Sequence, residues 1–297
     1  MSEWTEQLTE FIRSACRLEV LASKPGNVCP AYSFADATVD DFLVSADAVA
    51  PVLAQSAELG VGAAILRAVE LTVEKVGHNT NLGIILLLAP LAAVPRRECL
   101  SAGIRSVLNS LTVDDAVQTY RAIAAAAPGG LGTADAQDVG QSPDQNLRDC
   151  MRLAAERDLI AAQYSNGFRD VLEHGAWSLF HTRSWEDCAD KRLAWLAVNM
   201  LATRGDSLIA RKCGEQISLD VQCRAHGVLQ SGWPQSASGE SRYAEFDTFL
   251  RDTHHRRNPG TTADMIAAVL FAVLRSGVCR CDNDQLVFVE GANVQSL

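Results

Sequence analysis

Polar residues interrupt a chain rich in Ala and Leu in four places, and each place could carry chemistry. In the segment 24–28 (KPGNV), Lys24 either ends a helix by complementing its dipole or contacts an anion. The segment 77–83 (GHNTNLG) precedes an apolar helix, which Asn79 or Thr80 could cap. Alternatively, these side chains could bind phosphate or carboxylate together with the free N–H groups at the start of that helix. Both segments are therefore candidates for an anion site at a helix end.

Carboxylates stand close together in two stretches. Glu70 and Glu74 are one turn apart on the helix before residue 77, where they either hold a cation or form a solvated edge. The segment 129–139 (GGLGTADAQDV) is rich in glycine, which lets the backbone approach a ligand closely, and Asp135 and Asp138 could reach the same site. This segment matches neither a Walker loop nor a dinucleotide fingerprint.

The fourth place consists of two segments near the end of the chain. The segment 202–207 (ATRGDS) interrupts a strongly apolar helix. In the segment 254–264 (HHRRNPGTTAD), Thr261 and Asp264 fit a capping box at a helix start, with Asp in place of Glu. Alternatively, the two histidines and two arginines of this segment form a phosphate site beside the helix N-terminus.

The spacing of apolar residues predicts an all-α fold. Apolar residues recur at intervals of three and four, whereas alternation with a period of two is nearly absent. Residues 285–290 (QLVFVE) resemble a strand, which predicts an edge hairpin after residues 279–284. With no repeat or linker, residues 1–297 are expected to form a single multi-helix domain. The predicted helices span residues 5–22, 39–58, 61–75, 80–94, 96–109, 112–127, 144–163, 165–181, 185–203, 206–229, 240–254 and 261–276.

Composition and charge exclude several classes of protein. The 297 residues include 26 Lys and Arg against 36 Asp and Glu, a net charge of −10, so we expect no nucleic-acid partner. The longest apolar run, residues 82–94, is shorter than the roughly 20 residues of a membrane span, so we expect no membrane partner. Residues 1–23 lack signal-peptide features and the nine cysteines lack zinc-site spacing, which favours a cytoplasmic protein with free thiols.

Several of these segments occur in the order typical of one enzyme family. They resemble the motifs of the triphosphoribosyl-dephospho-CoA synthase family, and the resemblance covers most of the chain. At residues 81–82 and 261–262 the chain has Asn-Leu and Thr-Thr where the family has His-Lys and Gly-Ser, so it resembles a divergent member. The motifs that carry the resemblance are KPGNV at 24–28, NTNLG at 79–83, RGDS at 204–207 and NPGTTAD at 258–264.

The resemblance implies a transfer reaction on ATP. Family members move the triphosphoribosyl group of ATP to a hydroxyl of dephospho-CoA and release adenine, through an oxocarbenium-like transition state. Such a reaction needs Mg²⁺ and cationic donors for the triphosphate, negative charge beside the ribose and a base for the hydroxyl. The expected catalytic residues are Asp206, Asp264 and Asp138. The expected metal ligands are Glu70, Glu74, Asp135 and Asp206. The expected substrate- and phosphate-binding residues are Lys24, Asn27, Asn79, Thr80, Asn81, Arg204, Arg257 and Thr261.

Three other functions are compatible with the same residues. With water in place of the acceptor, the protein would be a nucleotide or ADP-ribose N-glycosidase. With another acceptor, it would serve a different cofactor pathway, for example pterin-linked one-carbon metabolism. Without turnover, it would be a non-catalytic nucleotide-binding helical protein. In every case the partners are a nucleotide and, for a transferase, a CoA-like or other cofactor precursor, and the alanine-rich helices could also form a homodimer.

Overall fold

The computed structural model of the protein describes residues 2–127, 142–294 and 297. It confirms the all-α prediction, because the regular secondary structure of these residues is helical apart from one small sheet near the C-terminal end. The helices of the first half are α1 (Glu3–Leu21), α2 (Val39–Leu53), α3 (Ser56–Leu59), α4 (Val61–Val76), α5 (Leu82–Ala92), α6 (Leu100–Ser110) and α7 (Val113–Ala126). Those of the second half are α8 (Leu147–Ala154), α9 (Leu159–Asn166), α10 (Ala176–His181), α11 (Arg192–Arg204), α12 (Ser207–Cys213), α13 (Glu215–Gln230), α14 (Ala237–Leu250) and α15 (Gly260–Arg275). The remaining elements are the π-helix η1 (Asp170–Gly175), the 3-10 helices η2 (Thr182–Ser184) and η3 (Ala189–Lys191), and the strands β1 (Cys279–Asp282) and β2 (Gln285–Phe288).

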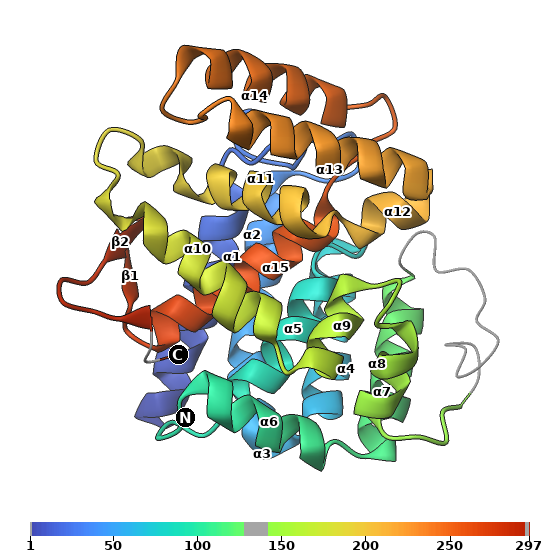
Figure 1. Ribbon diagram of the computed structural model, residues 1–297. Coiled ribbons are helices and arrows are strands. Elements are labelled where there is room, and N and C mark those ends of the chain that lie inside the picture. Colours follow the sequence, from blue (N-terminus) through green and yellow to red (C-terminus); the bar gives the residue numbers. More distant parts are fainter. Residues whose placement is uncertain (1, 128–141, 295–296) are drawn as a thin grey trace.

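Two apolar helices, α5 and α15, form the centre of the fold. Every residue of α5 from Gly83 to Ala92 is buried, as is every residue of α15 from Met265 to Leu274. A helix that is apolar on all sides has to be covered on all sides. In Figure 1, α15 accordingly runs through the middle of the molecule, between α11 above and α5 and α9 below. None of the described helices combines the length and apolarity that crossing a membrane requires.

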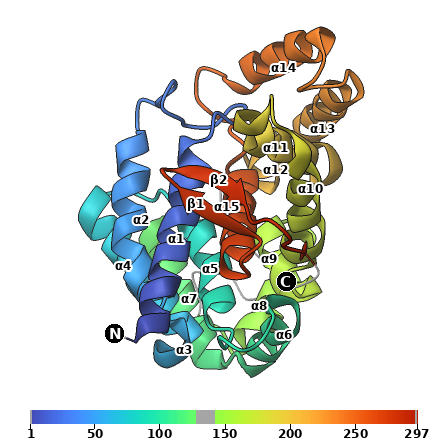
Figure 2. The same ribbon diagram turned by 90° about the vertical axis from the view of Figure 1, so that its left-hand side faces the viewer.

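The described helices bury their side chains in two apolar clusters. Helices α1, α2, α4 to α10 and α15 supply most of the larger cluster, whereas the smaller one is formed by α11 to α14 around Val198, Trp233 and Phe246. Helix α11 joins the two because it buries Leu196 and Met200 in the larger cluster and Val198 in the smaller one. Figure 2 shows α1, α2 and α4 on one side of α15 and α10 to α13 on the other. The single domain expected for residues 1–297 stays a prediction.

Besides the helix predicted for residues 39–58, which forms α2 and α3, two other predicted helices are each divided in two. The helix predicted for residues 144–163 is interrupted before Asp158, whose carboxylate accepts the N–H groups of Ile160 and Ala161 at 2.9 and 3.0 Å and thereby starts α9. The second division falls at Gly214, where a φ of +87° separates α12 from α13. Both breaks are local features that a helical hydrophobic pattern does not reveal, because the pattern continues through them.

The predicted hairpin is confirmed. Strands β1 and β2 pair antiparallel, with Cys279 opposite Phe288 at the open end. Asn283 and Asp284 make the turn with positive φ angles of 49° and 58°, as a type I′ turn requires. The guanidinium of Arg17 on α1 holds this turn through an Nη2–Oδ2 distance of 2.7 Å to Asp284.

The central position of α5 predicts a large loss of stability on truncating its side chains. Leu87 is fully buried, so Leu87→Ala removes packing and leaves a cavity, and we expect the free energy of unfolding to fall by about 2–5 kcal/mol. Leu219→Ala on α13, where the side chain is 52% exposed, is the control and should change it by less than about 0.5 kcal/mol. Urea denaturation followed by circular dichroism measures both, and equal losses would contradict the central role of α5.

Candidate active site

Four helices begin at the wall of one large cavity. The cavity has a volume of ≈ 1540 Å³, and the first residues of α5, α9, α12 and α15 all line it. Helix α15 packs against the other three. Each helix N-terminus carries N–H groups that have no partner within the helix and a partial positive charge, so their convergence favours negative charge in the cavity. These first residues are Leu82, Leu159, Ser207 and Gly260.

Asp206 ties two of these helix starts together. Its Oδ1 accepts the N–H groups of Leu208 and Ile209 in α12 at 2.9 and 3.1 Å. Its Oδ2 accepts the N–H and the hydroxyl of Thr262 in α15 at 2.8 and 2.7 Å. Burial raises the pKa of Asp206, although these four hydrogen bonds act in the opposite direction. Both carboxylate oxygens are thus committed to positioning α12 and α15.

Asp264 lies one turn into α15 and faces the start of α5. Its carboxylate accepts the N–H of Ile84, and a Cβ on Gly83 would lie only 2.1 Å from Asp264 Oδ2, so the close approach requires glycine. Burial and then the negative charges of nearby carboxylates raise the pKa of Asp264 well above its ordinary value. These carboxylates are Glu19, Asp206 and Asp158.

The predicted capping box of Thr261 and Asp264 is wrong. Helix α15 begins one residue earlier than expected, at Gly260, and its N-cap Pro259 has no side chain that could accept a hydrogen bond. Asp264 is therefore free to turn toward α5 and the cavity, while the Thr261 hydroxyl lies 3.1 Å from that of Ser207 at the start of α12.

A buried ion pair supports one side of the cavity. Lys24 is fully buried, and its Nζ lies 2.9 Å from Oε1 of Glu19, which lines the cavity. The ammonium also donates to the backbone carbonyls of Glu19 and Ala22 at the end of α1. Lys24 thus compensates a buried carboxylate and the C-terminus of a helix. It does not line the cavity, so the phosphate contact predicted for Lys24 is not part of this arrangement.

Cationic side chains gather where α8, α9 and α12 meet the cavity. Arg211 Nη1 lies 3.2 Å from Asp158 Oδ2, the carboxylate that caps α9. Arg157 and Lys212 also line the cavity, and neither forms an ion pair within the described residues. Unpaired cations beside helix N-termini are suited to a polyanionic ligand.

Asn27 presents an unsatisfied acceptor in the cavity wall. Its Nδ2 donates to Asn258 Oδ1 at 2.7 Å and to the Pro259 carbonyl at 3.3 Å, which joins the segment after α1 to the start of α15. Its Oδ1 is buried and has no hydrogen-bond partner in the described part of the chain. A buried acceptor without a partner is unusual in folded proteins, and a ligand hydroxyl could satisfy it.

The polar segment before α5 is largely occupied in starting that helix. Asn79 Oδ1 accepts the N–H groups of Asn81 and Leu82 at 3.2 and 3.0 Å. The Thr80 hydroxyl lies 2.8 Å from that of Ser45, and Asn81 Oδ1 accepts the hydroxyl of Thr72 on α4. All three residues of the segment 79–81 nevertheless line the cavity.

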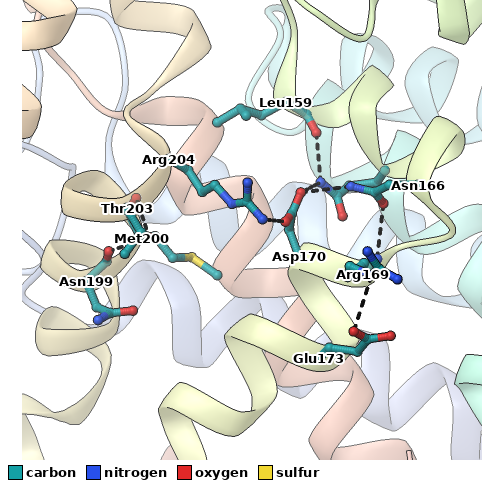
Figure 3. Close-up of polar contacts among 10 residues, drawn as sticks. Leu159, Asn166, Arg169, Asp170, Glu173, Asn199, Met200, Thr203 and Arg204 are labelled. Carbon is teal, nitrogen blue, oxygen red and sulfur yellow. Dashed lines mark hydrogen bonds and ion pairs between the residues drawn. The ribbon is translucent and has the colours of Figure 1, made fainter.

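Arg204 is held at the edge of the cavity by an ion pair with Asp170. Figure 3 shows its guanidinium reaching from α11 to this carboxylate on η1, with Asn166 on the far side. The other oxygen of Asp170 accepts Gln163 Nε2 at 2.8 Å and Asn166 Nδ2 at 2.9 Å. These contacts fix a buried carboxylate, whose position then fixes the partly exposed guanidinium.

Comparison with known proteins now decides the family. The model of CitG, the ATP:dephospho-CoA triphosphoribosyl transferases, matches residues 5–280. The chain belongs to this family. Its fold is also similar to the crystal structure of a protein from Archaeoglobus fulgidus assigned by name to the triphosphoribosyl-dephospho-CoA synthases, with a TM-score of 0.62 and 23% identity over 79% of this chain and 99% of that one. No protein among those of curated function matches the chain.

Most residues that the CitG-family motifs indicated meet at this cavity. Asn79, Asp206 and Asp264 are far apart in the sequence, and all three line this cavity. The full set of predicted residues that line the cavity is Asn27, Asn79, Thr80, Asn81, Arg204, Asp206, Thr261 and Asp264.

Other predicted residues are elsewhere. Glu70 and Glu74 are exposed on α4, 3.7 Å from Arg67 and 2.9 Å from Lys75, and neither lines the cavity. Arg257 also lies outside the lining, where it stacks over the Phe249 ring and faces a carboxylate of the preceding loop. The described residues contain no group of three or more His, Cys, Asp or Glu that could hold a metal ion. Asp135 and Asp138 fall outside the described residues.

Sequence reasoning missed Glu19, Asp158 and Asp170. The pairing of Glu19 with Lys24 spans five residues across the end of α1, which is not a helical contact spacing. Asp158 falls inside the helix predicted for residues 144–163, although an Asp before an apolar run is a cap signal that could have revealed α9. Asp170 carries no local signal, since its partner Arg204 is 34 residues away.

Because Asp206 bonds to the starts of both α12 and α15, its removal is expected to lower the stability of the protein more than the loss of an ordinary N-cap. Asp206→Ala removes acceptors from two helices at once, so we expect a loss of about 2–4 kcal/mol in the free energy of unfolding. Thr112→Ala, which removes an ordinary cap from α7 alone, is the matched control and should cost about 1 kcal/mol. Chemical denaturation compares them, and equal effects would mean that the contact with Thr262 contributes little.

Proposed function

We propose that this cavity performs the CitG-family transfer, with Asp264 as the residue that accepts the proton of the attacking hydroxyl. The observation that carries the proposal is the Asp264 carboxylate, which lies in the cavity among three other carboxylates and has a raised pKa. A general base works best when its pKa is near the working pH, and an ordinary Asp is too weakly basic. The environment of Asp264 supports this role better than that of any other carboxylate in the described lining.

The reaction then proceeds by substitution at C1′ of the ATP ribose. The C1′–N9 bond breaks and its electron pair leaves with the base, which takes up a proton from water and is released as adenine. An acceptor hydroxyl forms the new C1′–O bond and gives its proton to Asp264. Positive charge develops on the ribose in the transition state. The carboxylates of Glu19 and Asp158 face the same region and would stabilise this charge. Asp206 serves the site as a positioning residue, since both of its oxygens are already bonded.

The triphosphate is proposed to bind to the cationic side of the cavity. Arg157 and Lys212 are free of ion pairs among the described residues, and Arg204 and Arg211 present guanidinium groups beside them. The N–H groups at the start of α9 already donate to Ser207 and Asp158, so the side-chain cations are proposed to make the phosphate contacts. Asn27, with its unsatisfied acceptor, would accept a hydroxyl of a ribose.

Magnesium is proposed to enter with the nucleotide. Mg²⁺ typically takes one or two carboxylates and fills its other positions with water and phosphate oxygens, so it needs no preformed protein cage. Asp158 lines the cavity beside the cations proposed to bind the triphosphate, and it would be the protein ligand through Oδ2, which would leave Arg211 to the phosphates. When bound, the ion would neutralise charge on the triphosphate.

Removing the proposed base predicts a large kinetic effect. Asp264→Asn keeps the shape and the hydrogen-bond acceptor for Ile84 but cannot take a proton, so kcat should fall about 10²–10⁴-fold with little change in the KM for ATP. Asp114→Asn on the surface of α7 is the control and should leave kcat unchanged. Adenine released from ATP in the presence of dephospho-CoA is the readout, and full activity of a folded Asp264→Asn variant would remove Asp264 from the chemistry.

The same variant predicts a pH-dependent gain in stability. Because the folded-state pKa of Asp264 is raised, the folded protein binds more protons than the unfolded chain between the two pKa values, so its stability falls as pH rises through that window. Asp264→Asn lacks this loss, and its advantage over the wild type should grow from about pH 4 toward neutrality. Denaturant midpoints at several pH values measure this difference. A constant difference across the range would argue against a raised pKa.

The cationic side of the cavity predicts a specific loss of nucleotide affinity. Arg157→Ala and Lys212→Ala should each raise the KM for ATP by roughly 3- to 30-fold, because each removes a charge-assisted contact to phosphate. Arg242→Ala, an exposed arginine on α14 outside the cavity, is the control for net charge. Steady-state kinetics at fixed ionic strength measures all three, and equal changes in the control would indicate a general charge effect rather than a phosphate site.

A further inference from the structure

A second cavity lies next to the main one. It has a volume of ≈ 380 Å³ and is bounded by η1, α10, α11 and the first two turns of α15. Leu159 and Arg204 line both cavities, so the two spaces adjoin at these residues. The volume lies within the range of about 300–1,000 Å³ that small-molecule sites occupy.

The first two turns of α15 form a ridge between the two cavities. Thr261 and Asp264 are three residues apart and line the main cavity, whereas Thr262 and Met265, also three apart, line the second one. Residues at this spacing lie on the same helix face, so neighbouring faces of these two turns serve the two spaces. A ligand that crosses this ridge would place one part beside Asp264 and another part in the second cavity.

The charges of the second cavity do not favour phosphate. Its guanidinium, from Arg204, is already paired with Asp170, and no other Lys or Arg lines the cavity in the described part of the chain. Figure 3 shows this pair between η1 and α11, with Asn199, Met200 and Thr203 on the α11 side. The free cations Arg157 and Lys212 line only the main cavity. An uncharged part of a ligand therefore fits the second cavity, and its phosphates fit the first.

The lining of the second cavity combines apolar faces with free hydrogen-bonding groups. Leu159, Met200 and Met265 supply apolar surface, and thioether sulfurs make favourable contacts with aromatic rings. The amide of Asn199 and the hydroxyl of Ser178 have no hydrogen-bond partner within the described residues. A side-chain amide pairs with the N6 amino group and N7 of adenine through two hydrogen bonds.

The wall of the second cavity opposite α11 packs closely against its neighbours. It is the π-helix η1, an element that is rare and frequently found at functional sites. At its last residue, Gly175, a Cβ would lie 2.4 Å from Val269 Cγ2 and 2.9 Å from Met200 Cε. The absence of a side chain there lets η1 pack directly on α15 and sets the width of the cavity.

We propose that the second cavity binds the adenine base of a substrate, with Asn199 as the residue that recognises it. The inference rests on the proposed transferase function. The position of the ridge suits the base of ATP in particular. With adenine in the second cavity, the N-glycosidic bond of ATP would cross the ridge and place the ribose beside Asp264 in the main cavity. Dephospho-CoA also carries adenine, so kinetics with each substrate has to distinguish the two sources.

Calorimetric titration with free adenine tests the site without turnover. The wild type should bind adenine, and Asn199→Leu, which keeps the size of the side chain but removes the amide, should weaken binding by at least about tenfold. Ser178→Phe, which fills the cavity from α10, should abolish it. Asn109→Leu on α6, outside both cavities, is the matched control and should bind adenine normally.

Kinetics assigns the source of the base. A raised KM for ATP alone in Asn199→Leu supports an adenine site for the donor, and a raised KM for dephospho-CoA alone supports one for the acceptor. Absence of adenine binding by the wild type, or unchanged binding by both folded variants, would overturn the proposal. Adenine binding does not require Asp264, so Asp264→Asn should bind adenine normally, and failure of the proposed chemistry remains distinguishable from failure of this site.

Discussion

The convergence of four helix N-termini on one cavity is the constraint on which the site depends. Burying several carboxylates together is unfavourable because each loses hydration and repels the others. Here the starts of α9, α12 and α15 supply N–H groups to Asp158 and Asp206, and the start of α5 supplies one to Asp264. Hydrogen bonds from N–H groups and the partial positive charge of helix starts offset part of that cost. The same partial positive charge also favours the binding of a polyphosphate in the cavity.

Unequal hydrogen bonding gives neighbouring carboxylates different roles. Asp206 accepts four hydrogen bonds, so it is committed to holding α12 against α15. Within the described residues, Asp264 has one backbone donor, Ile84, and more negative neighbours, which leaves it able to exchange a proton. The charge of Glu19 is compensated by the buried ammonium of Lys24. The CitG-family reaction needs both kinds of group, namely fixed negative charge beside the ribose and a base with a raised pKa.

Much of the fold follows from the sequence because it rests on local signals. The continuous apolar stretches of α5 and α15 and the turn of the hairpin are each encoded within a short segment. The family motifs also indicated several polar residues of the cavity lining, including Asp264. What escaped prediction depends on contacts between distant segments. The pairing of Arg204 with Asp170 and the bond from Thr262 to Asp206 exist only after the helices pack. The exposed positions of Glu70 and Glu74 likewise depend on which face of α4 is covered.

The titration of the Asp264 carboxyl group tests the central claim most directly. It can be followed by ¹³C NMR of the ligand-free protein, with the signal assigned from its absence in Asp264→Asn. The account predicts a pKa well above the ordinary value of an aspartate, because burial and three neighbouring carboxylates act on this group at the meeting point of the helix starts. An Asp264 signal that titrates together with those of exposed aspartates would contradict it.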